Sequence, residues 1–430
     1  MPSARIEDYA IIGDCETVAL VSRGGSIDWL CWPHFASPAC FADLLGTPEN
    51  GRWLISPRQF HSARRKYREH TLILETSFEN DEGAVTLIDF MPIRGRNSDI
   101  VRIVRGDRGR VAMIMELVLR FGYGRTVPWV ERLRDGTLRA IAGPDMVVLR
   151  TPVEFGGRNL RTIAEFDIHA GQSVPFVLTY EASYRKLPAA INAETALRDT
   201  EQFWKEWTSR ISFKGEYSDA VQRSLITLKA LTYAPTGGIV AAPTTSLPEQ
   251  VGGTRNWDYR YSWLRDATFT LLVLMNAGYY DEARDWRDWL LRAAAGSPEQ
   301  LQIMYGIHGE RYLLEWEAKW LPGYERSAPV RIGNAASEQL QLDVYGEVAD
   351  ALLHAHLGGI PPRKSDLALL AKLTDHLSEI WMQPDEGIWE VRGEPQQFTY
   401  SKVMAWVAFD RTIKNAEGFG LQGNVEKWRV

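Results

Sequence analysis

The hydrophobic pattern of this 430-residue chain changes its period near residue 190. Before that point apolar and polar residues alternate in short segments, the period of a strand with one buried face. Gly, Asn and Asp separate these segments, which lie at residues 71–78, 84–90, 111–119, 146–149 and 173–178. Many strands without interleaved helices predict an antiparallel β-sandwich.

Beyond residue 190 the apolar residues recur at helical spacing. We expect a β-sandwich domain (1–190), a linker helix (191–215) and a helical catalytic domain (216–430). Long irregular loops between the helices, notably at 298–336, suggest helix pairs in a toroid whose loops form a pocket. The predicted helices of that domain are 217–233, 262–277, 280–294, 337–357, 365–381 and 398–416.

Composition excludes several functional classes. A net charge of −6 without a strongly basic cluster argues against a nucleic-acid partner. Three cysteines among apolar neighbours favour a reducing compartment, and no signal core or membrane-length apolar stretch occurs, so we expect a cytoplasmic protein. His354 and His356 fall on different helix faces, and no zinc or nucleotide-binding motif is present, so we expect no metal and no cofactor.

The segment 384–391 places Glu390 directly after Trp389, ahead of a predicted helix. A carboxyl held against an indole is poorly solvated, which raises its pKa and lets it remain a proton donor near neutral pH. Cleavage of an acetal needs such a donor, because the departing sugar oxygen must be protonated. A Trp–Glu pair at a helix edge is more often ordinary surface, so this segment alone does not decide the function.

A second cluster, residues 255–266, interleaves aromatic residues with Arg and Asp before a helix. Trp257 and Trp263 offer flat surfaces that stack on the apolar face of a sugar. Arg265 and Asp266 offer forked donors and a bidentate acceptor for sugar hydroxyls. The structural alternative is a buried Arg–Asp pair that caps the helix.

A third cluster lies at 323–347. It has Arg331 in a Gly-containing turn, followed by Glu338, Gln341 and Tyr345 at the spacing of one helix face. Such a polar face usually points to water, and the neighbouring turn makes a pocket wall the alternative. We therefore include Arg331 and Glu338 among the candidate substrate-binding residues, with Trp389.

Together these segments resemble glycoside hydrolase family 15, the glucoamylase and trehalase family, over nearly the whole chain. The matching segments, in the order and spacing of the family, are 11–14, 25–30, 242–249, 255–266, 331–347 and 387–406. The chain is most similar to the prokaryotic branch, which implies an N-terminal β-supersandwich followed by an (α/α)6 barrel. The resemblance also implies that Glu390 is the general acid and that Arg265 and Asp266, after Trp263, grip a terminal glucose.

The resemblance further implies an inverting mechanism, in which a second carboxylate about 6.5–9.5 Å from the acid activates water. In the family this general base lies well after the region of Glu390. We therefore expect a truncated product or fragment with an incomplete (α/α)6 toroid, without the base and with impaired activity. Its open apolar helix faces would favour association, including a homo-oligomer.

The sequence thus predicts an exo-acting α-glucoside hydrolase and does not separate trehalose from malto-oligosaccharides as the substrate. Two alternatives remain open. One is a phosphorolytic relative, in which phosphate replaces the activated water. The other is an inactive carbohydrate-binding protein.

Overall fold

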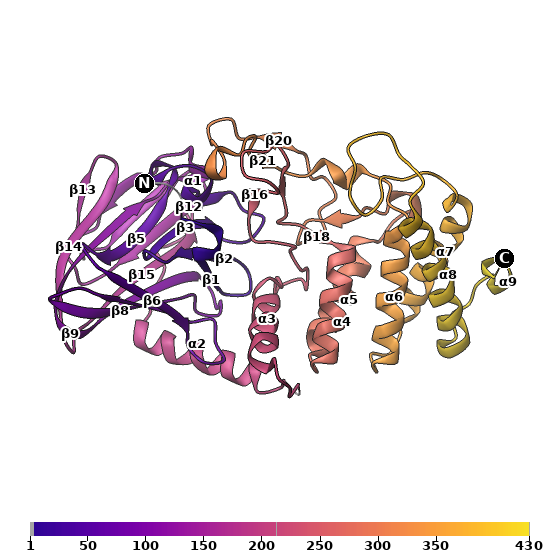
Figure 1. Ribbon diagram of the computed structural model, residues 1–430, viewed down its shortest axis with the longest axis horizontal. Helices are drawn as coiled ribbons and strands as arrows, with labels where there is room; N and C mark the ends of the chain where they lie inside the picture. The colour runs from indigo at the N-terminus through magenta and orange to yellow at the C-terminus, as the bar shows by residue number, and fades with distance from the viewer. Residues whose placement is uncertain (1–3, 212, 430) are drawn as a thin grey trace.

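The computed structural model describes residues 4–211 and 213–429. It places a β-rich half at the N-terminal end, and the helices follow side by side towards the C-terminus (Figure 1). Within the part of the chain just given, no helix is both long and apolar enough to cross a membrane. The predicted order, an antiparallel β-sandwich followed by a helical domain, is confirmed.

Fifteen antiparallel strands form the β-rich half. Strand β9 joins its two layers, because its first part pairs with β8 and β15 and its second part with β5 and β14. The strands are β1 (Tyr9–Gly13), β2 (Val18–Ser22), β3 (Ser26–Cys31), β4 (Ala39–Phe41), β5 (Arg52–Pro57), β6 (Ser62–Tyr67), β7 (Leu74–Glu79), β8 (Gly83–Phe90), β9 (Ser98–Val118), β10 (Trp129–Arg132), β11 (Leu138–Ala142), β12 (Asp145–Arg150), β13 (Gly156–Arg158), β14 (Arg161–His169) and β15 (Ser173–Ala182).

The alternating residues of these strands fill the space between the layers. Leu74 and Phe78 of β7 and Val85 and Leu87 of β8 are buried in one cluster with Trp53 of β5. This is the arrangement that a period of two requires when one strand face meets the core.

The helical half contains seven helices of 13 to 21 residues among the described residues after the sandwich, and α2 leads into it. They are α2 (Ala193–Thr208), α3 (Ser218–Ala230), α4 (Leu264–Asn276), α5 (Tyr280–Ala293), α6 (Asp343–Leu357), α7 (Lys364–Ile380) and α8 (Thr399–Phe419), and the short helices α1 (Phe121–Gly124) and α9 (Val425–Trp428) lie in the sandwich and at the C-terminal end. Short strand pairs form in the loops: β16 (Thr245–Pro248) with β17 (Asn256–Asp258), β18 (Ser262–Trp263) with β19 (Met304–Tyr305), and β20 (Trp316–Glu317) with β21 (Arg331–Ile332).

The helix predicted at 337–357 begins later in the structure than the sequence indicated. Residues 337–357 were expected to be continuous, but a 3₁₀ turn covers Ala335–Glu338 and α6 starts only at Asp343. The Asn334 side chain caps the turn by accepting the N–H of Ala336. The carboxylate of Asp385 accepts the N–H of Leu342 and thereby fixes the start of α6. A local cap and a contact with the distant Asp385 therefore override the helical spacing of this segment.

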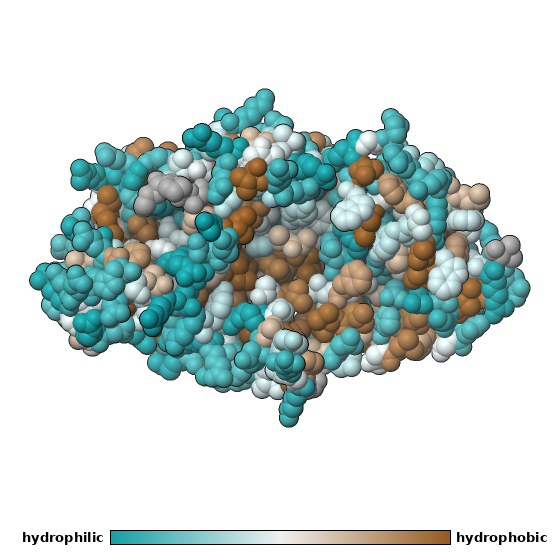
Figure 2. All heavy atoms as spheres, viewed as in Figure 1, coloured by the Kyte–Doolittle hydropathy of each residue, from teal (hydrophilic) through white to brown (hydrophobic). Residues whose placement is uncertain are grey.

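The helices pack with α6 between α4 and α8, and with α7 against α5. Leu271 of α4, Trp286 of α5, Leu352 of α6, Leu370 of α7 and Ala405 of α8 belong to one buried cluster. Hydrophobic residues also gather on the outer surface over the helical half, as the face in Figure 2 shows. Exposed large apolar side chains on α4 and α8 include Phe269, Val273, Val403 and Trp406.

A further core joins the two halves. Trp29 and Phe35 of the sandwich pack in one cluster with Trp204 of α2, Leu225 of α3 and Tyr279. The indole of Trp29 also donates to the carbonyl of Pro243 at 2.8 Å. The loops above the helices are thus held on a rigid base that includes the sandwich.

Candidate active site

A cavity of about 1030 Å³ lies among these loops. It is rich in arginine, carboxylate and aromatic side chains, which come from three separate parts of the helical half. Its lining residues are Glu249, Thr254, Arg255, Trp257, Tyr259, Trp263, Arg265, Asp266, Arg331, Ile388, Trp389, Glu390, Val391 and Arg392. Seven of the eight candidates from the sequence are among them; Glu338 is the exception.

Glu390 lies in a tight turn between α7 and α8. Its backbone N–H donates to the carbonyl of Gly387 at 3.0 Å, and both residues have positive φ, 50° and 64°. Only glycine fits at 387, because a Cβ there would lie 2.5 Å from the ring of Phe398. A non-glycine residue rarely adopts the backbone conformation of Glu390, and such strain is typical of functional sites.

The carboxylate of Glu390 is held by two side chains. One oxygen accepts the indole N–H of Trp263 at 2.7 Å and lies 3.6 Å from a guanidinium nitrogen of Arg265. The side chain is 20% exposed. Burial raises the pKa of Glu390 above its usual value, although the Trp263 hydrogen bond and the charge of Arg265 oppose the shift. The group therefore keeps its proton to higher pH than an exposed glutamate.

The indole beside the acid differs from the expected one. Trp263 is buried at 2% exposure and packs against Tyr259 and Tyr261, whereas the side chain of Trp389 is 78% exposed. The poorly solvated setting expected of Glu390 is present, but an indole 127 residues earlier in the chain provides it. Trp389 stands at the cavity edge and leaves much of its ring open to solvent.

Arg265 and Asp266 open the first turn of α4, next to the acid. The nearest guanidinium nitrogen of Arg265 and carboxylate oxygen of Asp266 are 3.5 Å apart, and Arg265 also donates weakly to the carbonyl of Ile388 at 3.4 Å. Asp266 is nearly half exposed to the cavity, and a carboxylate in the first turn is favoured by the helix dipole. These long contacts leave donors and acceptors free for a ligand.

Trp257 has a different environment from the one expected for a sugar platform. The guanidinium carbons of Arg331 and Arg392 lie 4.5 and 4.4 Å from the centroid of its ring, within cation–π range. Both arginines also contact the carboxylate of Glu315. The ring is therefore occupied by arginines, which form this wall of the cavity together with it.

Glu338 does not line the cavity. It is exposed at the end of the 3₁₀ turn, and because Gln339 is extended the expected polar helix face with Gln341 and Tyr345 does not form. The neighbouring Gln339 contacts the acid's loop instead, since its amide donates to the carbonyl of Val391 at 3.0 Å.

Sequence reasoning missed Arg392 and two buried acids, Asp343 and Glu347, on α6. Burial raises the pKa of Asp343 to about 6 and that of Glu347 to about 7, with Arg265 opposing both shifts. The Tyr400 hydroxyl donates to Glu347 at 2.9 Å, while one oxygen of Asp343 is buried without a hydrogen-bond partner among the described residues. The sequence shows that Asp343 and Glu347 have i, i+4 spacing. It does not show that both carboxyl groups are buried. Within residues 4–211 and 213–429 no group of three His, Cys, Asp or Glu side chains could hold a metal.

Comparisons with known proteins place this chain in a family. Residues 215–430 match the model of the glycosyl hydrolases family 15, and residues 2–204 match the trehalase-like, N-terminal model. The chain belongs to glycosyl hydrolases family 15. Its relatives include trehalases of Mycolicibacterium smegmatis, 37% identical with 100% of this chain and 69% of the relative covered, and of Thermoplasma acidophilum, 33% identical with 95% and 71% covered.

The fold of this family 15 chain is also similar to a solved structure. The crystal structure of a bacterial glucoamylase complexed with acarbose superposes with a TM-score of 0.65 at 13% identity, over 99% of this chain and 65% of the glucoamylase. At this identity the likeness concerns the fold alone. The chain spans about two thirds of the length of the proteins it matches.

Proposed function

We propose that this chain carries the general acid and the glucose-binding side chains of an inverting, exo-acting α-glucoside hydrolase of the trehalase or glucoamylase type. The setting of Glu390 is the observation that supports this most. Its carboxyl is mostly buried, has a raised pKa, and lies beside a cation whose remaining donors face the cavity. A proton donor next to free hydroxyl-binding groups is what exo-cleavage of a glucoside requires.

In the proposed reaction, Arg265 and Asp266 bind hydroxyls of the terminal glucose. The protonated carboxyl of Glu390 transfers its proton to the glycosidic oxygen as the bond from that oxygen to the anomeric carbon breaks. Water attacks the anomeric carbon from the opposite face, and a second carboxylate accepts the proton of that water. Glucose leaves as the β-anomer, and the second sugar leaves with the proton of Glu390.

Trehalose is the first substrate to test. The two relatives given above are trehalases, and a cavity of about 1030 Å³ can accommodate more than a single glucose unit. Malto-oligosaccharides are the second choice, because they present the same terminal α-glucose to Arg265 and Asp266.

We assign the second carboxylate, the general base of the proposed reaction, to a position outside the cavity of Glu390. We propose that it comes from sequence equivalent to the third of the relatives that this chain does not cover, on the same polypeptide or on another. Glu390-dependent hydrolysis of trehalose by the 430-residue chain alone would contradict this assignment and place the base within it.

The decisive variant is Glu390→Gln, with Glu338→Gln as a matched control outside the cavity. In a form of the enzyme that contains the second carboxylate, we expect turnover of trehalose to fall about 100- to 10,000-fold in the first variant and to be unchanged in the second, while calorimetry shows that trehalose still binds. Proton NMR of the initial products from trehalose should show equal amounts of β-glucose, from the ring that water attacks, and α-glucose, from the leaving ring. Initial release of α-glucose alone would contradict inversion, and strict dependence on phosphate with glucose 1-phosphate as product would establish the phosphorolytic alternative.

Chemical rescue covers the case in which the chain binds trehalose without turnover. Azide can replace the activated water, since it attacks the anomeric carbon without a base while Glu390 still protonates the leaving oxygen. Formation of β-glucosyl azide, lost in Glu390→Gln, would show a working acid without its base. No azide product from bound trehalose would favour an inactive carbohydrate-binding protein.

A further inference from the structure

A groove of about 530 Å³ in the sandwich shares no residue with the cavity of Glu390. It lies between β10 and β13, two strands that each pair on one side only. Its floor contains the buried Leu117, Leu119 and Leu138. Two edge strands and an apolar floor form a surface of the kind that folded proteins normally cover.

Large apolar side chains stand exposed around this groove. Trp129 is 76% exposed and Leu160 is 70% exposed, with Val127 and Val130 about half exposed. Tryptophan and leucine side chains so exposed at one groove go beyond the scattered apolar residues of an ordinary surface. Tryptophan and arginine, both present here, are the residue types that most often anchor protein interfaces.

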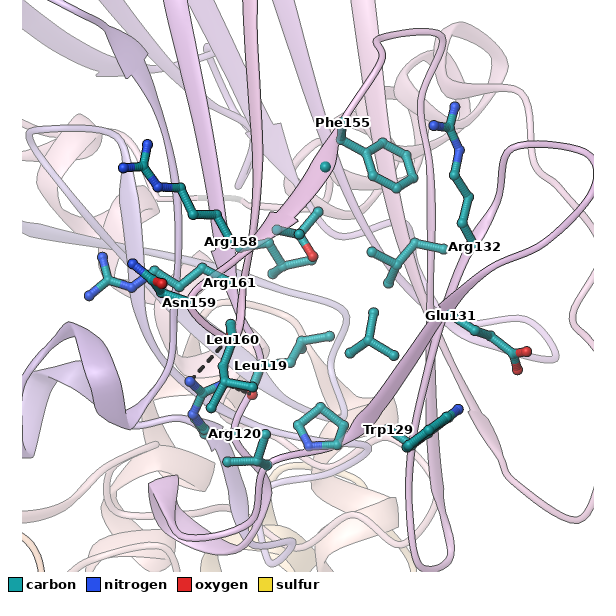
Figure 3. A pocket seen from close by; sticks show the side chains of 18 residues that line it. Leu119, Arg120, Trp129, Glu131, Arg132, Phe155, Arg158, Asn159, Leu160 and Arg161 are labelled. Carbon is teal, nitrogen blue, oxygen red and sulfur yellow. Dashed lines mark hydrogen bonds between the residues drawn. The ribbon is translucent and has the colours of Figure 1, made fainter.

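The turn that carries Leu160 has an unusual backbone. Asn159 and Leu160 both have positive φ, 53° and 58°, at the two-residue turn between β13 and β14. Glycine and asparagine suit such turns, whereas leucine is strained there. The Arg120 guanidinium donates to the Leu160 carbonyl at 3.2 Å, the dashed line in Figure 3. A clamped, strained turn that displays an apolar side chain indicates a binding role for that side chain.

The inside of the groove has little to offer a sugar. In Figure 3 the charged ends of Glu131, Arg158 and Arg161 turn away from the middle of the groove, and the apolar Leu119 and Phe155 also line it. Arg161 is paired with Glu49 and Glu116, and the Arg132 guanidinium covers Phe155 at 5.0 Å. A sugar would require donors and acceptors directed into the groove, so an apolar protein side chain fits it better.

We infer that this edge of the sandwich binds a second copy of the same chain. Trp129 points away from its own groove (Figure 3), so a copy related by a two-fold axis can insert its Trp129 into the groove of the first and receive the first one's in return. An isologous interface needs a projection and a hollow on one patch, and this patch has both. Glu131, beside the indole, then approaches the arginines on the rim of the other copy.

The charge pattern supports a self-complementary contact. The four residues of β10 include both signs, together with Trp129 and Val130. Glu131 pairs with Arg139 of its own chain and keeps part of its carboxylate exposed, and Arg132 lies over Phe155. Because the strand is so short and charged, backbone pairing alone would be weak. The indole in the groove therefore contributes most of the affinity, and the strand edges contribute orientation.

The test is sedimentation velocity on the full chain from about 1 to 100 μM. We expect a dimer that Trp129→Ala weakens about 30-fold, the typical effect of losing an interface anchor. Leu160→Gly is the second variant: glycine relieves the positive φ and preserves the fold while it removes the apolar contact. It should also weaken the dimer.

Trp406→Ala is the matched control, because Trp406 is a similarly exposed indole on α8, over the helical half. It should leave the dimer unchanged. A chain that is monomeric throughout, or a dimer lost in Trp406→Ala but intact in both groove variants, would overturn the inference. A monomeric chain that binds maltohexaose, with the binding abolished by Trp129→Ala, would also overturn it and would assign the groove to sugar.

Discussion

Two arginine–aspartate pairs occur in the same stretch of this chain, and they differ in what surrounds them. Asp258 and Arg260 are 0% and 2% exposed and form a bidentate pair at 2.7 and 2.9 Å. Arg260 also donates to the carbonyl of Ser37 and the hydroxyl of Tyr123 in the sandwich. The guanidinium and carboxylate groups of this pair are therefore used within the protein, where they hold the loop on the β-rich half.

The second pair, Arg265 and Asp266, is open. Its charges are 17% and 47% exposed, its closest contact is 3.5 Å, and it faces the cavity beside Glu390. The same residue types therefore serve structure in one place and ligand binding in the other. What separates the two roles is whether the hydrogen-bonding capacity is already used within the protein.

The largest expected effect comes from breaking the buried pair. Asp258→Ala leaves the Arg260 charge buried without its partner, which should lower the free energy of unfolding by about 3–5 kcal/mol. Urea denaturation measures this loss. Arg265→Ala, in the open pair, should cost clearly less, because this pair is more exposed and its contact is longer, and equal losses in the two variants would show that the pairs do not differ as described.

Arg265→Ala should instead affect activity. In a form of the enzyme that turns over trehalose, the lost charged hydrogen bonds to substrate should lower kcat/KM about 100-fold. Arg265→Lys keeps the charge but not the planar fork, so it should restore only part of the loss. Full activity in Arg265→Ala would remove this residue from the proposed glucose site.

Trp263→Phe tests how the surroundings of the open pair set the pKa of Glu390. The indole N–H stabilises the carboxylate form of Glu390, so its loss should raise the pKa of Glu390 further. The acid works when protonated, and activity is lost as the pH rises through its pKa. The alkaline limb of the kcat/KM profile should therefore move to higher pH, while Trp389→Phe should leave it in place.

The smallest effect is expected at Glu338, which is exposed and outside both pairs. Glu338→Ala should leave kcat/KM within about twofold of the starting value, because surface substitutions of this kind rarely matter. Gln339→Ala removes the hydrogen bond to the carbonyl of Val391 and should lower kcat/KM more. A larger loss of kcat/KM in Glu338→Ala than in Gln339→Ala would indicate that Glu338 does take part in substrate binding.

Much of the architecture follows from local pattern. The alternation at 84–90 reappears as β8 (Gly83–Phe90), and helical spacing at 280–294 as α5 (Tyr280–Ala293). The 3₁₀ turn at Ala335–Glu338 was missed because a side-chain cap and the distant Asp385 decide where α6 begins. A period describes which face is apolar, and it carries no information about such caps.

The sequence by itself determined the order of the two halves, the motif that carries Glu390, and seven of the residues that line its cavity, because periodicity and motif are local properties of the chain. Only the tertiary structure decided that Trp263 holds the acid and that arginines cover Trp257. It also decided that the buried arginine–aspartate pair is Arg260 with Asp258, whereas Asp266 stays open to the cavity. These outcomes depend on contacts across long stretches of sequence and on burial, and both arise only when the loops are packed against the sandwich.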